Sequence, residues 1–552
     1  MPGVDTTRGG RRGRRLPTTL RPALAGGAAL ALLAGAFSLG APASAAGRYG
    51  GTLTLVYQSD VPTLDPAGSP GYESVQAMYG IYNTLLTYAP TRTRLVPSLA
   101  TSYQVTDGGK VYTFHLRHGV KFSNGDPFTA EDVVFNLERQ INPKSGSYAQ
   151  SYYLDIAGAN AYAKGQAKTV SGLDAVNATT LKITLSAPEG YFPNILAMPT
   201  SDIADPAVVQ KYGAKYEDHA VGTGPYELKS WVHNQSLIEV RNTHYWGPRP
   251  YFNIIKFILG PSPETQFLMF KRGEVDAMSP VPPQDMAAIT GSMKKNLIVL
   301  AGTGSIDFYF MNVTYGPFKN RLVREALNLA VNRQRLVALD AGQAKVANQY
   351  LPPGYPGYQP NLPPIPYNPA RAKALLKRAG YTAKHPLKLT LTVNNDPAVV
   401  QQAESVEANF ASIGVKLTLD TESLSAYITA LSHNKVKFGI IQWGIDYPDP
   451  SDIFDSLLLG AADGTGNFAW WNDAAFNKLV NEADVMSPKQ DAQRYRLYDE
   501  AQAIAMKQSP WIPLIFPAST MLVSSSLRPT PVGANRFLYL GQMGLEENLI
   551  WK

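Results

Sequence analysis

The chain has 552 residues, a length that usually folds as more than one compact unit rather than around a single core. Of its formal charge of +7, residues 1–45 carry +5, so the remainder is nearly neutral and lacks the basic density of a nucleic-acid-binding protein. Cysteine is absent, which excludes disulfides, thiol catalysis and cysteine metal ligands.

Residues 1–45 have the three parts of an export signal. The basic stretch RGGRRGRR is followed by an uncharged run at 22–40 and by the small-x-small sequence ASA at 43–45. We therefore expect a signal peptide that ends at residue 45, and an extracytoplasmic protein in the periplasm or at the cell surface. An uncleaved anchor is the alternative, Sec and twin-arginine export both stay open, and no lipobox cysteine is available for a lipid tether.

The first half of the chain alternates strands with turns. Residues 50–58 predict a strand, and residues 111–122 predict a second strand that buries one face. Thr129 and Asp132 have the spacing of a capping box, so a helix should begin there. A glycine-rich turn leads into another strand within 222–231.

The middle of the chain shows clear helix boundaries. Residues 318–332 predict an amphipathic helix, and Asn332 is placed to cap the next one. The proline-rich segment 351–369 predicts an irregular surface loop, with a ligand for proline-binding domains as the alternative. Asn368 then precedes a proline at the first helical position, and Gly380 ends the helix.

A βαβαβ unit follows. Strands are predicted at 387–393, 415–420 and 438–443, with one helix in each interval. In open α/β sheets, ligands bind beyond the C-terminal ends of the parallel strands. We therefore expect the residues directly after 443 to lie where a ligand would bind.

Four aspartates follow the last of these strands at a spacing of three residues, namely Asp446, Asp449, Asp452 and Asp455. A calcium loop would need alternating oxygen ligands, a central glycine and a terminal glutamate, and this pattern is missing. Asp452 or Asp455 is expected to cap a helix. Asp446 lies nearest the strand end, where partial desolvation would make it a strong partner for a cationic ligand group.

Catalytic signatures are scarce. The chain lacks the nucleophile elbow GxSxG, the zinc motif HExxH, a P-loop and a dinucleotide fingerprint after a strand. His115 and His118 lie on opposite faces of a strand, so they do not form a joint metal site. We expect no catalytic residues, no metal site and no cofactor, although an exported hydrolase stays an alternative.

At this point the chain resembles the extracellular solute-binding family 5 of peptide and nickel ABC importers, from about residue 50 to the C-terminus. The motifs that carry the resemblance are LVPSLATSY and YTFHLRHGVKFSNGDPFTAEDVVFNLER within 95–139, GTGPYELKSW (222–231), NTHYWG (242–247), FKNRLVREALNLAVNRQRLV (318–337), YNPARAKALLKRAGY (367–381) and WGIDYPDPSDIF (443–454).

The resemblance implies an α/β, bilobed Venus-flytrap fold of the type II periplasmic-binding-protein class, with an additional α+β domain inserted in the first lobe. The expected divisions are lobe I at 46–92, 222–305 and 510–552, the inserted domain at 93–221, and lobe II at 306–509. It also implies an extracytoplasmic receptor that captures peptides and delivers them to an ABC permease in the membrane.

In the family's peptide binders, the aspartate after the tryptophan strand binds the peptide's α-ammonium, and this role carries over to Asp446, with Trp443 and Tyr447 beside it. Peptide main-chain groups then pair in strand fashion. Dipeptide-specific relatives have an arginine for the ligand carboxylate where this chain has Val393-Asn394-Asn395. The departure favours longer peptides or a non-peptide ligand.

Several aromatic residues are weaker candidates for the ligand site. Tyr72, Tyr226 and Trp470, or Trp471 in place of the last, are expected to stack on a ligand or else to pack in the core. The alternatives to a peptide are an oligosaccharide or a metal chelate, and a scaffold or chaperone-like role uses the same site loosely. We expect a monomer with no nucleic-acid partner.

Overall fold

The structure is a computed structural model that describes residues 49–68, 71–88, 94–302, 304–529 and 550–551. The predicted signal peptide at 1–45 lies outside the described residues. Residues 47–552 form one compact unit by their internal contacts, and the fold described below is that of this unit alone. Among the described helices, none is both long enough and apolar enough to cross a bilayer.

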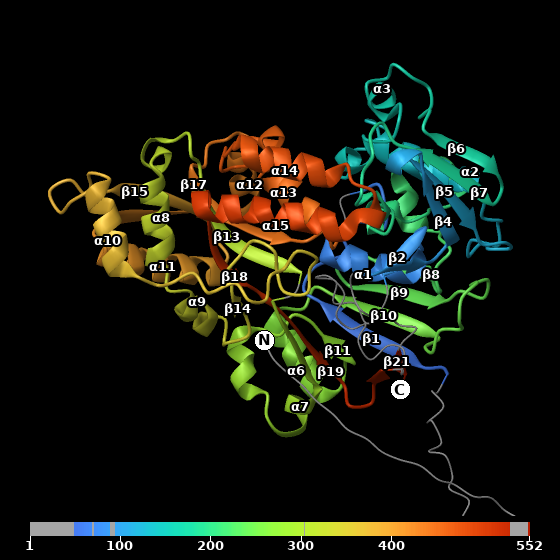
Figure 1. Ribbon diagram of the computed structural model, residues 1–552. Helices are drawn as coiled ribbons and strands as arrows, with labels where there is room; N and C mark the ends of the chain where they lie inside the picture. Colours follow the sequence, from blue (N-terminus) through green and yellow to red (C-terminus); the bar gives the residue numbers. More distant parts are fainter. Residues whose placement is uncertain (1–48, 69–70, 89–93, 303, 530–549, 552) are drawn as a thin grey trace, which may run out of the picture. The chain divides into compact units, whose positions relative to one another are not determined.

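The first large sheet, which we call the lobe I sheet, has seven strands (Figure 1). Its strand order is β12 (Leu297–Ala301), β19 (Ala518–Val523), β11 (Ala277–Met278), β1 (Thr52–Tyr57), β10 (Ile254–Leu259), β9 (Ser236–Arg241) and β8 (Tyr226–Val232). β1 pairs in parallel with β10 and β11. The helices α1 (Tyr72–Ile81), α6 (Pro263–Arg272) and α7 (Gly291–Asn296) accompany this sheet.

The second large sheet, the lobe II sheet, has six strands. Its order is β14 (Lys345–Val346), β18 (Trp511–Phe516), β13 (Ser305–Met311), β17 (Phe438–Gly444), β15 (Lys388–Asn394) and β16 (Lys416–Glu422). β15 pairs in parallel with both β16 and β17, which is the arrangement that the βαβαβ pattern predicts.

Eight helices surround this sheet: α8 (Arg321–Ala330), α9 (Arg333–Leu339), α10 (Pro369–Arg378), α11 (Pro397–Ser412), α12 (Leu424–Ser432), α13 (Pro450–Leu457), α14 (Ala474–Asp484) and α15 (Asp491–Gln508). The amphipathic faces of these helices and the sheet share one apolar core.

A third sheet lies within the segment that the sequence assigns to the inserted domain. Its order is β4 (Ala100–Thr106), β5 (Val111–Leu116), β7 (Thr180–Thr184) and β6 (Leu173–Asn177). The helices α2 (Ala130–Ile141), α3 (Ala159–Ala163), α4 (Phe192–Ile195) and α5 (Pro206–Tyr212) belong to the same segment, and a short hairpin of β2 (Leu86–Tyr88) and β3 (Leu95–Pro97) leads into β4.

Local signals fixed most helix ends. Thr129 and Asp132 form the expected capping box at the start of α2. Asn332 caps α9, and Asn368 caps α10. The helix predicted over 318–332 is shorter than expected, because Asn320 accepts a hydrogen bond from a main-chain N–H and starts α8.

The C-terminal boundary between the two lobes differs from the expected position at 509–510. β18 pairs with β13 in the lobe II sheet, whereas β19 pairs with β11 and β12 in the lobe I sheet. The chain therefore crosses at Pro517, between the two strands. The apolar run WIPLIF is compatible with a buried strand of either sheet, so its composition could not place the crossing.

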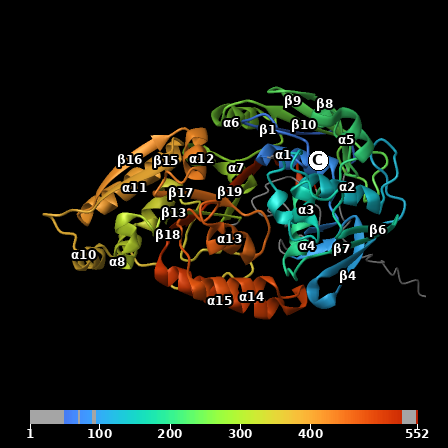
Figure 2. The ribbon, with the colours of Figure 1, turned by 90° about the horizontal axis from the view of Figure 1, so that it is seen from above.

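Lobe II and the inserted region touch through α14 and α15, which run toward β4 in both ribbon views (Figures 1 and 2). The main-chain N–H of Gly190 donates a hydrogen bond to the carbonyl oxygen of Asp484 over 2.9 Å. The Cα of Gly109 faces Ser487 in the same area. These contacts join two segments that are far apart in the sequence.

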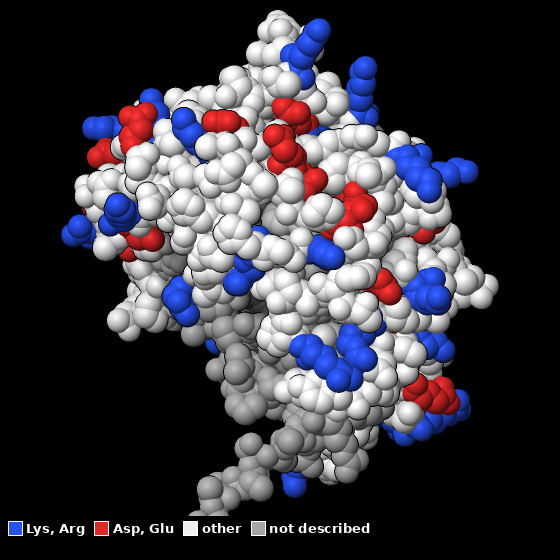
Figure 3. Space-filling view, turned by 90° about the vertical axis from the view of Figure 1, so that its right-hand side faces the viewer, with Lys and Arg blue, Asp and Glu red and all other residues white. Residues whose placement is uncertain are grey.

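Charged side chains of both signs are interspersed on the face shown in Figure 3. Lysines and arginines are separated there by uncharged surface and by aspartates and glutamates. On this described face, there is thus no continuous basic track of the kind that follows a nucleic-acid backbone.

Candidate ligand-binding site

The turn after β17 is built around the N-terminus of α13. Pro450 is the first helical residue, and Asp449 caps the helix by accepting a hydrogen bond from the N–H of Ser451 over 3.1 Å. The expectation that Asp452 or Asp455 caps a helix is therefore wrong. A proline at the first helical position makes the preceding residue the cap, and both other aspartates lie inside the helix.

Asp452 ties the strand end to this turn. Its side chain is fully buried, and its Oδ2 accepts a hydrogen bond from the indole N–H of Trp443 over 3.0 Å. The same oxygen accepts a longer contact of 3.4 Å from the main-chain N–H of Asp446. Asp452 therefore holds the tryptophan and the following turn in one arrangement.

Asp446 is half-buried, and its Oδ2 accepts a hydrogen bond of 2.6 Å from the hydroxyl of Tyr152. Burial raises the pKa of this carboxyl, and the hydrogen bond from Tyr152 opposes that rise. No lysine, arginine or histidine of the described residues forms an ion pair with it. The site thus holds a carboxylate that has a hydroxyl donor but no cation.

Four tyrosines lie at or near the turn that carries Asp446. Tyr447 is buried, and its ring stacks on Tyr191 at 5.7 Å and meets Tyr152 edge-on at 6.0 Å. Tyr148 is exposed, and the pKa of its hydroxyl is raised by burial of the oxygen and by the charge of Asp446. Tyr148, Tyr152 and Tyr191 all come from the inserted region, so this region supplies the aromatic wall.

One edge of β17 is free next to this carboxylate. β13 pairs with β17 along its whole length, but β15 pairs with it only at Thr392 and Gly439. That register places Asn394, the last residue of β15, level with Ile441. Within the described sheet, the last three residues of β17 therefore have a strand on one side only.

The free edge carries main-chain donors and acceptors. The N–H of Ile445 donates to Gly304 on the β13 side, and strand residues alternate in the direction of their main-chain groups. Gln442 and Gly444 consequently point their N–H and C=O groups away from β13, and both residues are exposed. An extended chain can pair with this edge as an added strand.

The sequence profile of bacterial extracellular solute-binding proteins, family 5 Middle, matches residues 94–465, which is more than half of the chain. The chain belongs to this family.

Relatives and solved structures agree with this assignment. The glutathione-binding protein GsiB of Escherichia coli O6:K15:H31 is 32% identical over 469 residues, covering 83% of this chain and 87% of the relative. The probable deoxycholate-binding periplasmic protein YgiS of Escherichia coli K12 is 29% identical, covering 83% and 86%. The periplasmic binding protein DppA of Helicobacter pylori, in complex with the peptide STSA, is 27% identical with a TM-score of 0.74, covering 91% and 98%.

The predicted family and its bilobed fold are thereby confirmed, and the protein is a solute-binding receptor of the periplasmic-binding-protein type. Its relatives by family and by structure are binding proteins rather than enzymes.

Within this solute-binding protein, four predicted site residues lie together, two lie elsewhere, and the side chain of the seventh lies outside the described residues. Trp443, Asp446 and Tyr447 share the turn after β17, and Asn394 lies at the same end of the sheet. The Asn394 side chain is buried and accepts a hydrogen bond from the main chain of Asp396. It therefore closes the loop after β15 and supplies no charge for a ligand carboxylate.

Tyr226 and Trp470 lie elsewhere. Tyr226 is fully buried in the lobe I core, where its hydroxyl donates to the carbonyl of Phe252. Its position matches the alternative that it packs in the core. The indole N–H of Trp470 donates to Asn434, which precedes β17, at the opposite end of the strand from Asp446. Tyr72 begins α1, but its side chain lies outside the described residues.

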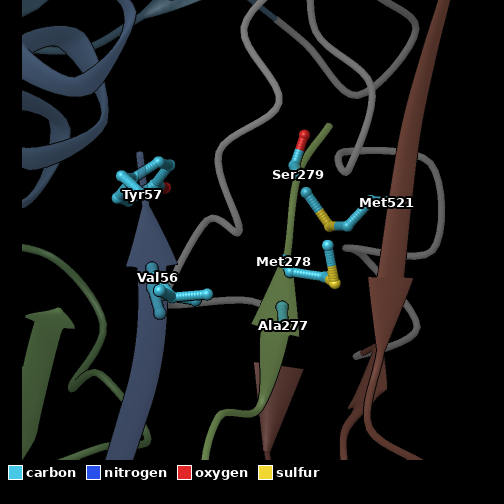
Figure 4. A pocket seen from close by; sticks show the side chains of 7 residues that line it. Val56, Tyr57, Ala277, Met278, Ser279 and Met521 are labelled. Atoms are coloured by element: carbon cyan, nitrogen blue, oxygen red, sulfur yellow. The ribbon is translucent and has the colours of Figure 1, made fainter. Parts of the chain in front are cut away.

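Two hollows in the described residues do not coincide with this site. A cavity of about 10 Å³ lies between β1, β11 and β19, lined by Tyr57, Met278, Ser279 and Met521 among others (Figure 4). It has room for about one water molecule. A larger surface hollow of about 530 Å³ lies beside α5 and β8 and contains none of the predicted ligand residues.

The sequence did not identify the buried ion pair behind the site. Arg494 of α15 donates to both carboxylate oxygens of Asp449, and the two side chains are 1% and 0% exposed. The pKa values of three nearby carboxyls, Glu189, Asp455 and Asp484, are raised by burial and by the charges of neighbouring carboxylates. Because Arg494 and Asp449 are 45 residues apart in sequence, no local sequence pattern indicated that they pair.

Proposed function

We propose that this solute-binding protein captures peptides with a free N-terminus and delivers them to an ABC permease in the membrane. The observation that carries the proposal is Asp446, a half-buried carboxylate without an ionic partner in the described chain, directly beyond the free edge of β17. The α-ammonium group of a peptide lies at the start of its extended main chain. A peptide therefore supplies both a cation for Asp446 and a main chain that can pair with the free edge of β17.

Main-chain pairing gives the remaining affinity. A peptide extended along Gln442 and Gly444 would form hydrogen bonds that are independent of its side chains, so the receptor would accept many sequences. Asn394 offers no positive charge for the ligand's carboxylate. We therefore propose that peptides longer than two residues bind, with their C-termini unrestrained by an ion pair.

The named ligands of relatives support a peptide more than a bile acid. The structural relative from Helicobacter pylori holds the tetrapeptide STSA, and GsiB is named for glutathione. YgiS is named for deoxycholate, which is an anion. An unpaired carboxylate at Asp446 would repel an anion, so a deoxycholate-type ligand is disfavoured here.

Export by the segment at 1–45, removal of that segment and a monomeric state belong to the same proposal. The family consists of extracellular proteins, and the basic, apolar and small-residue parts of the N-terminus are those of a signal peptide. The absence of cysteine means that a lipid anchor on that residue cannot hold the receptor at the membrane.

A ligand panel tests the proposal. Purified receptor is titrated by calorimetry with dialanine, trialanine, pentaalanine, N-acetyl-trialanine and deoxycholate. We expect trialanine and pentaalanine to bind at least tenfold more tightly than the acetylated peptide. Equal affinity for free and acetylated peptides, or preferential binding of deoxycholate, would contradict the proposal, and cleavage products in the recovered solution would indicate a hydrolase.

A further inference from the structure

Asp446 and Asp452 form a pair of carboxyls that share the turn after β17. The main-chain N–H of Asp446 contacts Oδ2 of Asp452 over 3.4 Å, and Trp443 donates to the same oxygen. Oδ1 of Asp452 is buried and has no hydrogen-bond partner among the described residues. An ionised carboxylate with one orphaned oxygen and no solvent contact is strongly disfavoured.

Among the residues that the structure describes, no cation is free to stabilise a charge on Asp452. The ionisable groups that face it are Asp446, Asp449, Tyr152, Tyr355 and Tyr447, and each of them is acidic. The nearby guanidinium of Arg494 is already paired with Asp449. Asp452 lies in the first turn of α13, and it shares the positive end of the helix dipole with the Asp449 carboxylate, which caps the helix.

The carboxyl groups of Asp446 and Asp452 differ in their burial and in the hydrogen bonds that they accept. Asp446 is half-buried and accepts the Tyr152 hydroxyl, a donor that favours its ionised form. Asp452 is fully buried, and its two donors both use Oδ2, so a proton on Oδ1 is the arrangement with the smallest penalty. Two coupled carboxyls of this kind titrate as a pair.

We propose that Asp452 is a positioning residue that carries a proton in the empty receptor, so that Asp446 alone bears the negative charge. This proton leaves when a cationic group binds Asp446. The inference rests on the proposed function, because it assigns a proton-coupled step to the same site. The proton passes to solvent past the half-buried Asp446, and no bond to the ligand is formed or broken.

The coupling has a defined sign. A positive charge at Asp446 favours ionisation of both carboxyls, so binding releases a proton and affinity rises with pH. The rise ends where the empty receptor has itself lost the proton. Over the interval in which a full proton is released, affinity for a cationic probe increases about tenfold per pH unit.

Calorimetry measures the released proton directly. Trialanine is titrated into the receptor in phosphate and in Tris at one pH, because the difference in apparent enthalpy gives the number of protons released. The wild type should release protons, whereas Asp452→Asn should release none. Asp455→Asn is the matched control, a half-buried aspartate of the same helix that faces Asp484 and Asp449, and it should release as many protons as the wild type.

The result that would overturn the inference is equal proton release by Asp452→Asn and the wild type. A uniform loss of affinity at every pH, with unchanged proton release, would also overturn it, because that is the effect of a merely structural residue. Asp452→Ser replaces the amide variant if the latter does not fold.

A ligand-free measurement separates this inference from the proposed function. In infrared spectra of the empty receptor near neutral pH, the C=O band of a protonated carboxyl should be present in the wild type and reduced in Asp452→Asn. If trialanine fails to bind the wild type, the peptide proposal fails while this spectrum still tests the proton on Asp452. Identical spectra in the carboxyl region would contradict the inference.

Discussion

The hydroxyl of Tyr152 donates a hydrogen bond to Oδ2 of Asp446 over 2.6 Å, although the two residues are 294 positions apart in sequence. Tyr152 comes from the inserted region, and Asp446 follows the central part of the lobe II sheet. The contact therefore links Asp446, the carboxylate proposed to bind the ligand, to the inserted region. The charge of this carboxylate then depends on the inserted region and lobe II lying close together.

Removing the Tyr152 hydroxyl should raise the pH below which the affinity for trialanine falls. In Tyr152→Phe, burial still raises the pKa of Asp446, but the opposing hydrogen bond is lost. A hydrogen bond to a charged group contributes about 1.5–3 kcal/mol, so the acid limb of trialanine affinity should shift upward by about one to two pH units. Calorimetric titrations from pH 5 to 8 measure the shift.

Tyr153→Phe is the control, since its hydroxyl contacts Thr200 and Ser201 instead of Asp446. This variant should keep the wild-type profile. Superimposable profiles for Tyr152→Phe and the wild type would show that the hydroxyl does not tune the carboxylate.

If a peptide pairs with the free edge of β17, losing the main-chain N–H of Gly444 should weaken peptide binding. A Cβ at this position would have no atom within 4 Å, so Gly444→Ala should bind trialanine as the wild type does. Gly444→Pro removes the N–H that points away from β13, and one lost hydrogen bond should weaken binding by about 0.5–1.5 kcal/mol, or two- to tenfold. Equal affinities of the alanine and proline variants would argue against strand addition.

The ion pair of Arg494 and Asp449 should be a major determinant of stability. Arg494→Met leaves a buried carboxylate without its cation, which should lower the free energy of unfolding by about 3–5 kcal/mol. Arg371→Met is the matched control, because the Arg371 and Glu325 side chains are 59% and 23% exposed, and it should cost less than about 1 kcal/mol. Urea unfolding measures both.

The double variant Arg494→Met with Asp449→Leu should regain part of the loss, because it removes both charges together but also removes the Asp449 cap of α13. A loss for Arg494→Met no larger than that for Arg371→Met would refute the assigned role.

Stability should fall as pH rises toward neutrality. Burial raises the pKa of Asp307 and of Asp484 to about 7, so the folded state keeps protons that the unfolded chain loses near pH 4. Each such group therefore stabilises the fold fully below about pH 4, and that contribution declines by about 1.4 kcal/mol per pH unit until its folded pKa is passed.

Urea unfolding of the wild type and Asp307→Asn between pH 4.5 and 7 checks this slope. The variant has no proton to lose at that position, so its free energy of unfolding should decline less steeply. A stability that increases over this interval would contradict the assigned burial of these carboxyls.

Sequence patterns were most informative where a local physical rule fixes the structure. The βαβαβ unit, the capping box of Thr129 and the cap at Asn368 all depend on residues within a few positions of one another. The turn after Trp443 was placed correctly at the end of its strand for the same reason, since a parallel strand must present its C-terminal end at one edge of the sheet.

Features that depend on distant contacts could not be predicted. Tyr152 belongs to a segment without clear periodicity, and nothing near it in sequence indicates a contact with Asp446. Arg494 lies on a long helix with several charged residues, so its burial followed only from packing against Asp449. Tyr226 and Trp470 have the composition of ligand-stacking residues, but aromatic rings serve core packing equally well.

The most direct test of the account is the response of Asp446→Asn to peptides with free and with blocked N-termini. The substitution keeps the size of the side chain and removes its charge. Affinity for trialanine should fall by about 2–5 kcal/mol, whereas affinity for N-acetyl-trialanine should change by less than about 1 kcal/mol. Equal losses for the two peptides in parallel calorimetric titrations would contradict the claim that Asp446 recognises the positively charged end of the ligand.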